Sequence, residues 1–370
     1  MKTPKKKFIS VVGTRPNFIK LAPLYNFFKS NESVIHLVCH TGQHYDFSMS
    51  KVFFQELQMP EPDFFLGITG NTHAEQTANI MTEFEKLLEK EKPDLIIVFG
   101  DVNSTMACSL AASKLNIKIA HVEAGLRSFD RTMPEEVNRI ITDVLSDFLF
   151  ISEQSGLINL KKEGISEEKY FFTGNIMIDS LVHNMDAIDN SKSFSKFNLD
   201  SGNYLLATFH RPSNVDKKEN FLEIIDFLLE TSKKIKIIFP VHPRTLSNIK
   251  NMGLLDNFND NIILTEPLGY IDFLCLVKNA AIVVTDSGGI QEETTFLGVP
   301  CITFRDNTER PATVDIGTNI LAGTSIVNLK KIMNVFYTGK MSEKKQIPEF
   351  WDGKTAVRIG NILLEKFYSK

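Results

Sequence analysis

The sequence contains only four cysteines in 370 residues, and none of them belongs to a C-x-x-C pair. They lie far apart in apolar segments, so we predict buried, reduced thiols at Cys39, Cys108, Cys275 and Cys301. The eight histidines form no H-E-x-x-H or comparable ligand pattern, so we predict no structural or catalytic zinc. A strict G-x-G-x-x-G after a strand is also missing, which weakens a nicotinamide-dependent function without excluding it.

The chain also has little net charge and no long hydrophobic run. Its formal net charge of -4 gives no general electrostatic attraction to nucleic acid or to an anionic membrane, so basic groups must act locally. The apolar run from Phe8 to Val12 is too short for the core of a signal peptide, and no later segment is long enough to span a bilayer. We therefore predict a soluble, cytoplasmic protein with neither nucleic-acid nor membrane partners.

What the sequence does contain is a regular alternation of short apolar strands and helical stretches. With 370 residues, 43% of them hydrophobic, the chain is long for one core, so we expect two domains. The predicted strands of the first series are Lys7–Val12, Val34–His40, Leu95–Phe99, Lys118–Val122, Phe148–Ile151 and Tyr170–Phe172, and helices begin near Asn17, Ala74, Asn103, Glu135 and Glu153. Those of the second series are Tyr204–Phe209, Ile235–Phe239, Ile262–Leu264, Ile282–Thr285 and Cys301–Phe304. Runs of βα units predict parallel sheets with right-handed crossovers.

The polar stretch from Ile188 to Asn203 is a candidate linker between the two series. The simplest assembly is an α/β protein of two doubly wound, Rossmann-like domains that face each other across a cleft. We place the first domain at residues 1–185 plus 355–370, and the second at residues 200–354. The tail is given to the first domain because its amphipathic segment, Thr355 to Phe367, could pack back across the hinge; the alternative is a terminal helix on the second domain.

Two predicted strands of the first domain end in carboxylates. Leu95–Phe99 leads through a glycine to Asp101, and Lys118–Val122 leads directly to Glu123. Ligands of open parallel sheets collect at the carboxyl ends of the strands, so both side chains should face one crevice. A carboxylate at the end of an apolar strand is costly unless it is partnered or used, which makes Asp101 and Glu123 candidate catalytic groups.

Three further candidates have simple structural explanations. Glu135 and Glu136 follow Pro134 at the start of a predicted helix, where acids complement the helix dipole, and a catalytic role for one of them is the alternative. Phe273 precedes the strand that leads to Ser287 and could stack on a base. In a chain with 29 phenylalanines, however, a core position explains it as well.

The first strand runs into the turn Gly13-Thr14-Arg15-Pro16 before a helix. Gly13 permits close approach of a ligand to the backbone, and Arg15 offers a forked donor beside a helix N-terminus, a combination suited to phosphate. Lys20 lies one turn into the same helix. A Gly-Thr turn with a surface arginine is also common in α/β proteins, so this motif alone does not specify a phosphate site.

The best candidate for an anion site is the turn that reads DSGGIQEE at residues 286–293. Gly288 and Gly289, at a strand-to-helix turn, expose several backbone N–H groups, and Ser287 adds a hydroxyl. Glu293, one turn along, could accept bonds from paired sugar hydroxyls, as acids do with ribose in other nucleotide sites. Alternatively, Glu292 and Glu293 are first-turn partners of the helix dipole, which would explain at least one of them.

Basic side chains follow the neighbouring strands of the second domain. His210 and Arg211 end one strand and His242 follows the next, so two histidine-containing strand ends lie beside the glycine turn and favour anion binding. A single strand-end histidine is more often structural. Arg305 and Arg310 add positive charge after a further strand, although one of them could balance a neighbouring acid.

Eight stretches spread over nearly the whole chain resemble the non-hydrolysing UDP-N-acetylglucosamine 2-epimerases: GTRPNFIK, TGQHYD, GDVNS, HVEAGLRSFDRTMPEEVNR, HRPSNVD, PVHPRT, DSGGIQEE and RDNTERP. They occur in the order that the family has, and HVEAGLRS, PEEVNR and DSGGIQEE are the most specific. The resemblance implies a two-domain fold like that of the GT-B glycosyltransferases, no metal or redox cofactor, a UDP-sugar substrate and a homodimer. It also implies a role in supplying precursors of cell-surface polysaccharides.

The same resemblance implies roles for individual residues by position. The acid–base carboxylates are Asp101, Glu123 and Glu135. The residues that hold the diphosphate are Arg15, His210, Ser287, Gly288 and Gly289, and we count His210 as catalytic too. The remaining contacts are Glu293 at the ribose, Phe273 at uracil, and Lys20, Arg211 and Arg310 near the substrate. The chain departs from the commonest family version at Asn17, where that version has glutamate, and at Pro212-Ser213, which replaces Arg-Glu.

The chemistry that the resemblance implies needs residues of these types. The C2 proton of the sugar is not adjacent to a carbonyl, so the C1–O bond must loosen before a carboxylate can remove that proton. A glycal and free UDP result, and delivery of a proton to the other face with return of UDP gives UDP-N-acetylmannosamine. The alternatives are an epimerase of a related UDP-2-acetamido sugar, a hydrolysing epimerase, a GT-B-type glycosyltransferase or a noncatalytic UDP-sugar sensor.

Overall fold

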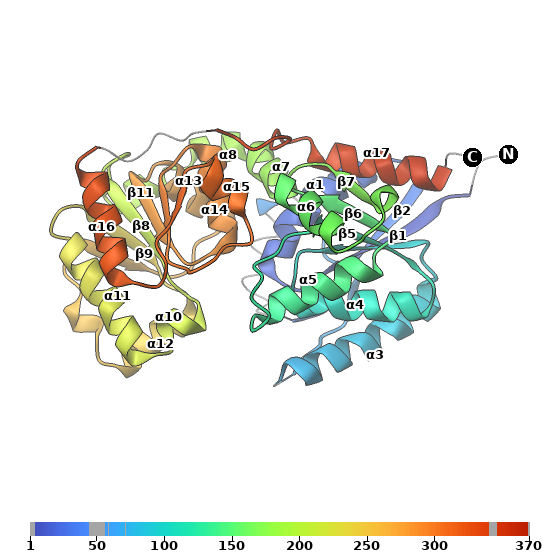
Figure 1. The fold of residues 1–370 in the computed structure, drawn as a ribbon, viewed down its shortest axis with the longest axis horizontal. Coiled ribbons are helices and arrows are strands. Elements are labelled where there is room, and N and C mark those ends of the chain that lie inside the picture. The colour runs from blue at the N-terminus through green and yellow to red at the C-terminus, as the bar shows by residue number, and fades with distance from the viewer. Residues whose placement is uncertain (1–3, 44–55, 58, 71, 340–345, 369–370) are drawn as a thin grey trace. The chain divides into compact units, whose positions relative to one another are not determined.

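The computed structural model describes residues 4–43, 56–57, 59–70, 72–339 and 346–368. The chain forms two compact units, Met1–His183 with Glu349–Lys370 and Asn184–Pro348 (Figure 1). Part of the TGQHYD stretch, from residue 44 on, lies outside the described residues. Among the described helices, none combines the length and the apolarity needed to cross a membrane.

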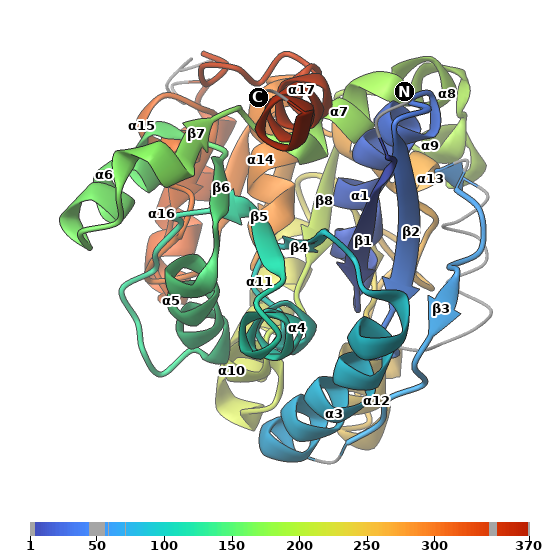
Figure 2. The same cartoon turned by 90° about the vertical axis from the view of Figure 1, so that its right-hand side faces the viewer.

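The first unit contains a seven-stranded, fully parallel sheet in the order β3-β2-β1-β4-β5-β6-β7. Its strands are β1 (Lys6–Val12), β2 (Val34–His40), β3 (Phe64–Phe65), β4 (Leu95–Phe99), β5 (Lys118–Ala124), β6 (Phe148–Ile151) and β7 (Tyr170–Phe172). Its helices are α1 (Arg15–Lys29), α3 (His73–Glu91), α4 (Asn103–Lys114), α5 (Pro134–Leu145), α6 (Gln154–Lys162), η1 (Glu167–Lys169), α7 (Ile176–His183) and α17 (Thr355–Tyr368). Figure 2 shows α1, α7 and α17 on one face of this sheet and α3, α4 and α5 on the other.

β4 lies at the centre of the first sheet, and this position explains why its sequence is a continuous apolar run. All five residues of β4 are buried, because helices cover both faces of a parallel sheet and the strand cannot alternate between polar and apolar side chains. The chain reverses its winding direction between β1 and β4, since β2 and β3 extend on one side of β1 and β4 to β7 on the other. Asp101 follows β4 after one glycine at this switch point, where doubly wound folds bind ligands.

The second unit contains a six-stranded parallel sheet in the order β10-β9-β8-β11-β12-β13. Its strands are β8 (Tyr204–Thr208), β9 (Lys236–Pro240), β10 (Ile262–Thr265), β11 (Ile282–Thr285), β12 (Cys301–Thr303) and β13 (Asn319–Leu321). Its helices are α8 (Met185–Asn190), α9 (Ser193–Lys196), α10 (Pro212–Val215), α11 (Lys218–Thr231), α12 (Pro243–Asn251), η2 (Leu255–Asn257), α13 (Tyr270–Lys278), α14 (Gly288–Leu297), α15 (Pro311–Asp315) and α16 (Ile326–Tyr337). The predicted class of two doubly wound parallel sheets is confirmed.

Alternate residues of the second sheet enter two different cores. Leu205 and Ala207 of β8 pack in the core that includes α11 and α16, whereas Tyr204 and Leu206 pack with Leu276 of α13. Successive side chains of a strand point to opposite faces, so a wholly apolar strand fills both layers. The switch point of this sheet lies between β8 and β11, and His210 and Asp286 follow those two strands.

The polar stretch predicted as a linker contains structure. Residues 188–203 include the end of α8 and all of α9, which pack against α13, because Ile188 and Leu199 are buried anchors in an otherwise polar sequence. The tail helix α17 belongs to the first unit, where the carboxylate of Asp179 accepts the N–H groups of Thr355 and Ala356 at 3.0 and 2.7 Å. All four cysteines are buried free thiols.

Candidate functional site

Asp101 is the first candidate carboxylate, and the structure pairs it with an arginine. Its Oδ2 lies 2.5 Å from Nη2 of Arg139 in α5, and Arg139 is itself buried. Nη1 of the same guanidinium donates to Glu136 at 2.7 Å. The side chain of Asp101 is 26% exposed, so the carboxylate reaches solvent while its charge is balanced from within the fold.

Glu123 does not follow β5, as the sequence suggested, but lies inside it. The register between β5 and β6 shifts at this residue, and Glu123 has a φ of 75°. A bulge re-aims one side chain of a strand, and positive φ is an outlier for a residue with a long side chain, so backbone strain is stored at a candidate catalytic group. The apolar pattern ends at Val122 and gives no signal that the strand continues past the acid.

The carboxylate of Glu123 forms an ion pair with Lys20 of α1, and both side chains are almost fully buried. A Cβ atom added at Gly100 would lie 2.9 Å from Nζ of Lys20 and 3.3 Å from Oε2 of Glu123. This pair therefore packs against the residue that precedes Asp101. The structure thus brings Asp101, Glu123 and Lys20 together.

The two acids at the start of α5 have different surroundings. Glu136 is buried and accepts bonds from Ser128 N and Oγ and from Phe129 N at 2.9 to 3.0 Å, so it anchors the preceding loop. Glu135 is exposed on the same turn. Glu136 therefore has a structural role in holding the loop, whereas the side chain of Glu135 is exposed to solvent and can contact a ligand.

Arg15 is the half-buried first residue of α1, and Asn17 organises the turn before it. Oδ1 of Asn17 accepts bonds from Gly13 N, Thr14 N and Thr14 Oγ1, and its Nδ2 donates to Phe99 O at 3.0 Å. An amide can donate and accept at once, which a glutamate at this position could not do in ionised form. Asn17 thus joins the first turn to the end of β4.

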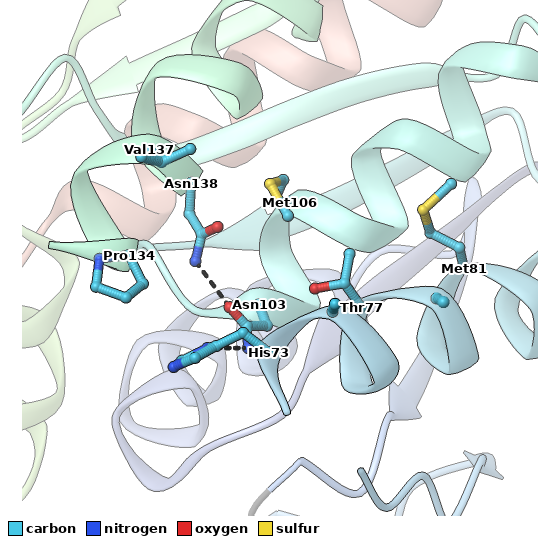
Figure 3. A pocket seen from close by; sticks show the side chains of 10 residues that line it. His73, Thr77, Met81, Asn103, Met106, Pro134, Val137 and Asn138 are labelled. Carbon is cyan, nitrogen blue, oxygen red and sulfur yellow. Dashed lines mark hydrogen bonds between the residues drawn. The ribbon is translucent and has the colours of Figure 1, made fainter. Parts of the chain in front are cut away.

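A pocket of about 400 Å³ lies among the first turns of α3, α4 and α5 (Figure 3). None of the site residues predicted from the sequence lines it. Its polar edge is formed by Asn103 and Asn138, which bond to each other at 3.2 Å, while Asn103 contacts Nδ1 of His73 at 3.0 Å (Figure 3). Asn138 also donates to the carbonyl oxygen of Asp101 at 2.8 Å. Asn138 at the pocket's edge therefore stabilises the turn that carries Asp101, but the Asp101 carboxylate does not line the pocket.

In the second unit, His210 and Asp286 form a pair at the ends of β8 and β11. Nδ1 of His210 lies 3.0 Å from Oδ1 of Asp286, and the histidine side chain is 41% exposed. The buried carboxylate also accepts the backbone N–H groups of His210 and Arg211 and the amide of Asn214. Burial would raise the pKa of Asp286, but these donors lower it below its ordinary value. An ionised Asp286 fixes a hydrogen on Nδ1. This role cannot be predicted from the sequence, in which Asp286 is only the residue before the glycine turn.

The glycine turn after Asp286 lies beside Arg310. A Cβ atom at Gly288 would be 2.8 Å from Oε1 of Glu309 and 2.9 Å from Nη1 of Arg310, so a larger residue there would displace the ends of these two side chains. Ser287 caps α14 in the extended conformation, and Gly288 is the first helical residue. Helix N-termini bind anions, and an arginine at that end adds charge.

Arg305 and Arg310 both contact Glu309. Arg305 donates to Oε2 at 2.7 Å, while Arg310 pairs with Oε1 and with Glu292, 3.0 Å from its Nε. The two arginines are buried. Both arginines therefore balance buried acids, and Arg310 also lies at the glycine turn.

The two remaining contacts predicted in the second unit, Phe273 and Glu293, belong to α13 and α14, which pack on one core. Phe273 is partly buried and packs on the core formed by α13 and α14, which is the simpler role considered from sequence. Glu293 is buried, and burial together with Glu292 raises its pKa to about 8. Its carboxyl is therefore neutral at pH 7 and can donate as well as accept a hydrogen bond.

This raised pKa predicts how stability depends on pH. An unfolded glutamate is ionised above its ordinary pKa, but folded Glu293 keeps its proton up to about pH 8, so stability falls as the pH rises through this window. Glu293→Gln should therefore raise Tm by at least about 2 °C relative to the wild type at pH 8.5 and much less at pH 5. Thermal denaturation across pH 5–9 measures this, with exposed Glu266→Gln as control. Parallel curves for Glu293→Gln and the wild type would contradict the assignment.

Among the described residues, no group of three or more His, Cys, Asp or Glu side chains has the arrangement needed to hold a metal ion. The carboxylates of Asp101 and Glu123 with their cations, and the His210–Asp286 pair, are groups suited to proton transfer and anion binding.

Two doubly wound units place the chain in the class of GT-B-like α/β proteins. A UDP-glucosyltransferase from Polygonum tinctorium has this arrangement, with a TM-score of 0.63 at 12% identity over 100% of both chains, a likeness that shows the fold alone. Within this class, the chain belongs to the UDP-N-acetylglucosamine 2-epimerase family, whose model matches residues 27–364. The resemblance seen in the sequence motifs is therefore confirmed.

Named relatives support this membership. The chain is 44% identical over 364 residues to the UDP-N-acetylglucosamine 2-epimerase of Methanocaldococcus jannaschii, covering 96% of this chain and 98% of the relative. The crystal structure of that enzyme with UDP-GlcNAc and UDP matches with a TM-score of 0.90 and covers 96% of this chain and 99% of the other. The chain is also 39% identical over 323 residues to a UDP-2,3-diacetamido-2,3-dideoxy-D-glucuronate 2-epimerase of Pseudomonas aeruginosa, covering 86% and 89% of the two chains.

Proposed function

We propose that this isomerase converts UDP-N-acetylglucosamine and UDP-N-acetylmannosamine into each other by elimination and re-addition of UDP. The observation that carries the proposal is the pairing of two strand-end carboxylates, Asp101 and Glu123, each with its own buried cation. An acid–base reaction at a single carbon needs carboxylates held in fixed positions, because proton transfer depends on geometry first. A binding protein or a transferase would not require them.

The first step is loss of UDP. The C1–O bond breaks with its electrons moving to the diphosphate, and positive charge develops at C1 and the ring oxygen. His210, with a hydrogen fixed on Nδ1 by Asp286, and the N–H groups at Gly288 and Gly289 would hold the departing diphosphate, assisted by Arg15, Arg211, Ser287 and Arg310. Glu293 would meet the ribose and Phe273 the uracil.

The second step is proton removal from C2. The developing charge at C1 makes this proton acidic, and one carboxylate among Asp101, Glu123 and Glu135 takes it, which leaves a glycal with a double bond between C1 and C2. Re-addition reverses the electron flow: another of these groups, which has taken up a proton from solvent, delivers it as a carboxylic acid to the opposite face of C2, and UDP bonds to C1 again. The ion pairs with Arg139 and Lys20 keep two of these groups ionised and ready to accept a proton.

A single NMR experiment tests the proposal. Purified protein incubated with UDP-N-acetylglucosamine alone in deuterated water should produce UDP-N-acetylmannosamine and place deuterium at C2 of both sugars. Net release of UDP would indicate a hydrolysing enzyme. A requirement for an acceptor would indicate a glycosyltransferase, and binding without C2 exchange would indicate a sensor.

A second candidate function is epimerisation of a related UDP-2-acetamido sugar, and one finding favours it. The Pseudomonas relative acts, by its name, on a sugar that differs at C3 and C6, although it shares 39% identity with this chain. Comparing initial epimerisation rates on the two sugars would decide between them. The homodimer implied by the sequence motifs stays a prediction, which sedimentation of the purified protein would test.

A further inference from the structure

Gln291 is a fully buried residue in the first turn of α14, and its side-chain amide bonds to three separate segments of the second unit. Its Nε2 donates to the carbonyl oxygen of Ser287, which caps the helix, at 3.1 Å. Its Oε1 accepts from Oγ1 of Thr308 at 2.8 Å and from Nδ2 of Asn319 in β13 at 3.1 Å. The amide therefore joins the glycine turn to the loop after β12 and to the edge strand of the sheet.

The loop after β12 leads to Arg310, and the Gln291 network holds the backbone of that arginine on both sides. Oγ1 of Thr308 donates to Gln291 and accepts the N–H of Arg310 at 3.1 Å. The carbonyl oxygen of Arg310 accepts from Oγ1 of Thr313 at 2.8 Å, and the same hydroxyl accepts from Nδ2 of Asn319 at 3.2 Å. Both polar groups of the Arg310 backbone are thus connected to the amide of Gln291.

The network fixes which way the Gln291 amide points. Oδ1 of Asn319 accepts from Oγ1 of Thr303 at 2.7 Å, so Nδ2 of Asn319 is the donor toward Gln291 and Oε1 must face it. The carbonyl oxygen of Ser287 only accepts, so Nε2 must face the glycine turn. Only a neutral amide can donate at one end and accept at the other in this way, and a buried polar network with satisfied members holds one arrangement.

The side chain of Arg310 also lies against the glycine turn. A Cβ atom at Gly288 would be 2.9 Å from its Nη1, and its Nε lies 3.0 Å from Oε2 of Glu292, the residue after Gln291. The ion pair therefore orients the guanidinium, while the hydrogen bonds of Gln291 hold the backbone that carries it. A shift of the loop would separate Arg310 from the backbone N–H groups at the start of α14, although each group would still be present.

We propose that Gln291 is a positioning residue for the diphosphate site, because its amide fixes the distance between the start of α14 and Arg310. The N–H groups at Gly288 and the guanidinium can then hold one diphosphate without rearrangement, and a site formed before its ligand arrives binds more tightly. Gln291 is fully buried and acts through Ser287 and Arg310. The identity of the ligand rests on the proposed function, whereas the coupling of the two segments does not.

Binding of UDP and of uridine to a Gln291→Met variant tests the positioning role. Methionine has nearly the length of glutamine but can replace neither its donor nor its acceptor. We expect the Kd for UDP to rise about 10-fold, because the loop of Arg310 is no longer held at the glycine turn. Uridine lacks the diphosphate, so its Kd should stay close to that of the wild type. Calorimetry measures the first affinity and an NMR titration the second.

A pair of variants at Thr308 keeps the test decisive if Gln291→Met does not fold. Thr308 is only half-buried, and its hydroxyl alone links Gln291 to the N–H of Arg310. Thr308→Val keeps the shape but removes the hydroxyl, so it should weaken UDP binding and leave uridine binding unchanged. Thr308→Ser keeps the hydroxyl and should restore the affinity for UDP. Equal affinities of the two variants for UDP would overturn the proposal.

Asn279→Leu is the matched control. The Asn279 amide also donates to a carbonyl oxygen four residues earlier, that of Cys275 at 2.9 Å, and accepts from Oγ of Ser201 at 2.7 Å, but it lies at the C-terminal end of α13. This change should alter neither affinity. A folded Gln291→Met variant that binds UDP like the wild type, or loses UDP and uridine affinity equally, would overturn the positioning role alone. A wild-type protein that bound no UDP would overturn the proposed function as well.

Discussion

The Asp101→Asn variant is expected to exchange the C2 proton of UDP-N-acetylglucosamine with solvent about 10²- to 10⁴-fold more slowly than the wild type. Asparagine has nearly the size of aspartate but cannot take up a proton at neutral pH. Arg139 loses its ionic contact with residue 101 but keeps its bond to Glu136, which still accepts the N–H groups of Ser128 and Phe129 and so anchors the loop before α5. UDP should bind almost as before, because the groups proposed to hold it belong mainly to the second unit.

Deuterium incorporation followed by NMR measures the rate, and calorimetry with UDP measures the affinity. Asp147→Asn is the matched control, since Asp147 is likewise an aspartate paired with a cation, Lys118, but it lies at the amino end of the strands. That change should leave exchange unaffected. If Asp101→Asn exchanges the proton at close to the wild-type rate, Asp101 is not an acid–base group in this reaction.

The strand ends of the fold could be predicted from sequence because they follow from apolar runs. β4 is a continuous buried run, and its end at Phe99 places Asp101 one glycine further on, as expected. The same reasoning found the turn at Gly288 and the histidine at position 210. It missed β3 and β13, which have two and three residues and are too short to form a periodic pattern.

The partners of the candidate carboxylates could not be predicted in this way. Lys20 and Glu123 are 103 residues apart, and their contact depends on a bulge that no apolar pattern marks. In the sequence, Arg139 looks like any residue of an amphipathic helix. Only the fold shows that it lies beside Asp101. Sequence patterns report which elements form and where they end, whereas the pairing of charges depends on the direction of individual side chains across different elements.

Asp286→Asn is expected to lower kcat by about 10²- to 10⁴-fold, because Asp286 holds the His210 ring in one tautomer and orientation. The carboxylate accepts the backbone N–H groups of His210 and Arg211 together with the amide of Asn214. An asparagine would turn an N–H₂ group toward at least one of these donors. We also expect the variant to lose about 1–3 kcal/mol of stability at pH 7, since a buried donor is left without an acceptor.

The pH dependence of this loss separates electrostatics from packing. Because the pKa of folded Asp286 is below its ordinary value, its ionised form stabilises the fold at pH 7, and that contribution disappears as the pH falls through the folded pKa. The difference in Tm between wild type and Asp286→Asn should therefore be larger at pH 7 than near pH 3. Asp306→Asn, an exposed aspartate that accepts bonds from Thr324, should change neither kcat nor this difference. A folded Asp286→Asn variant with wild-type kcat would show that His210 needs no carboxylate to orient it.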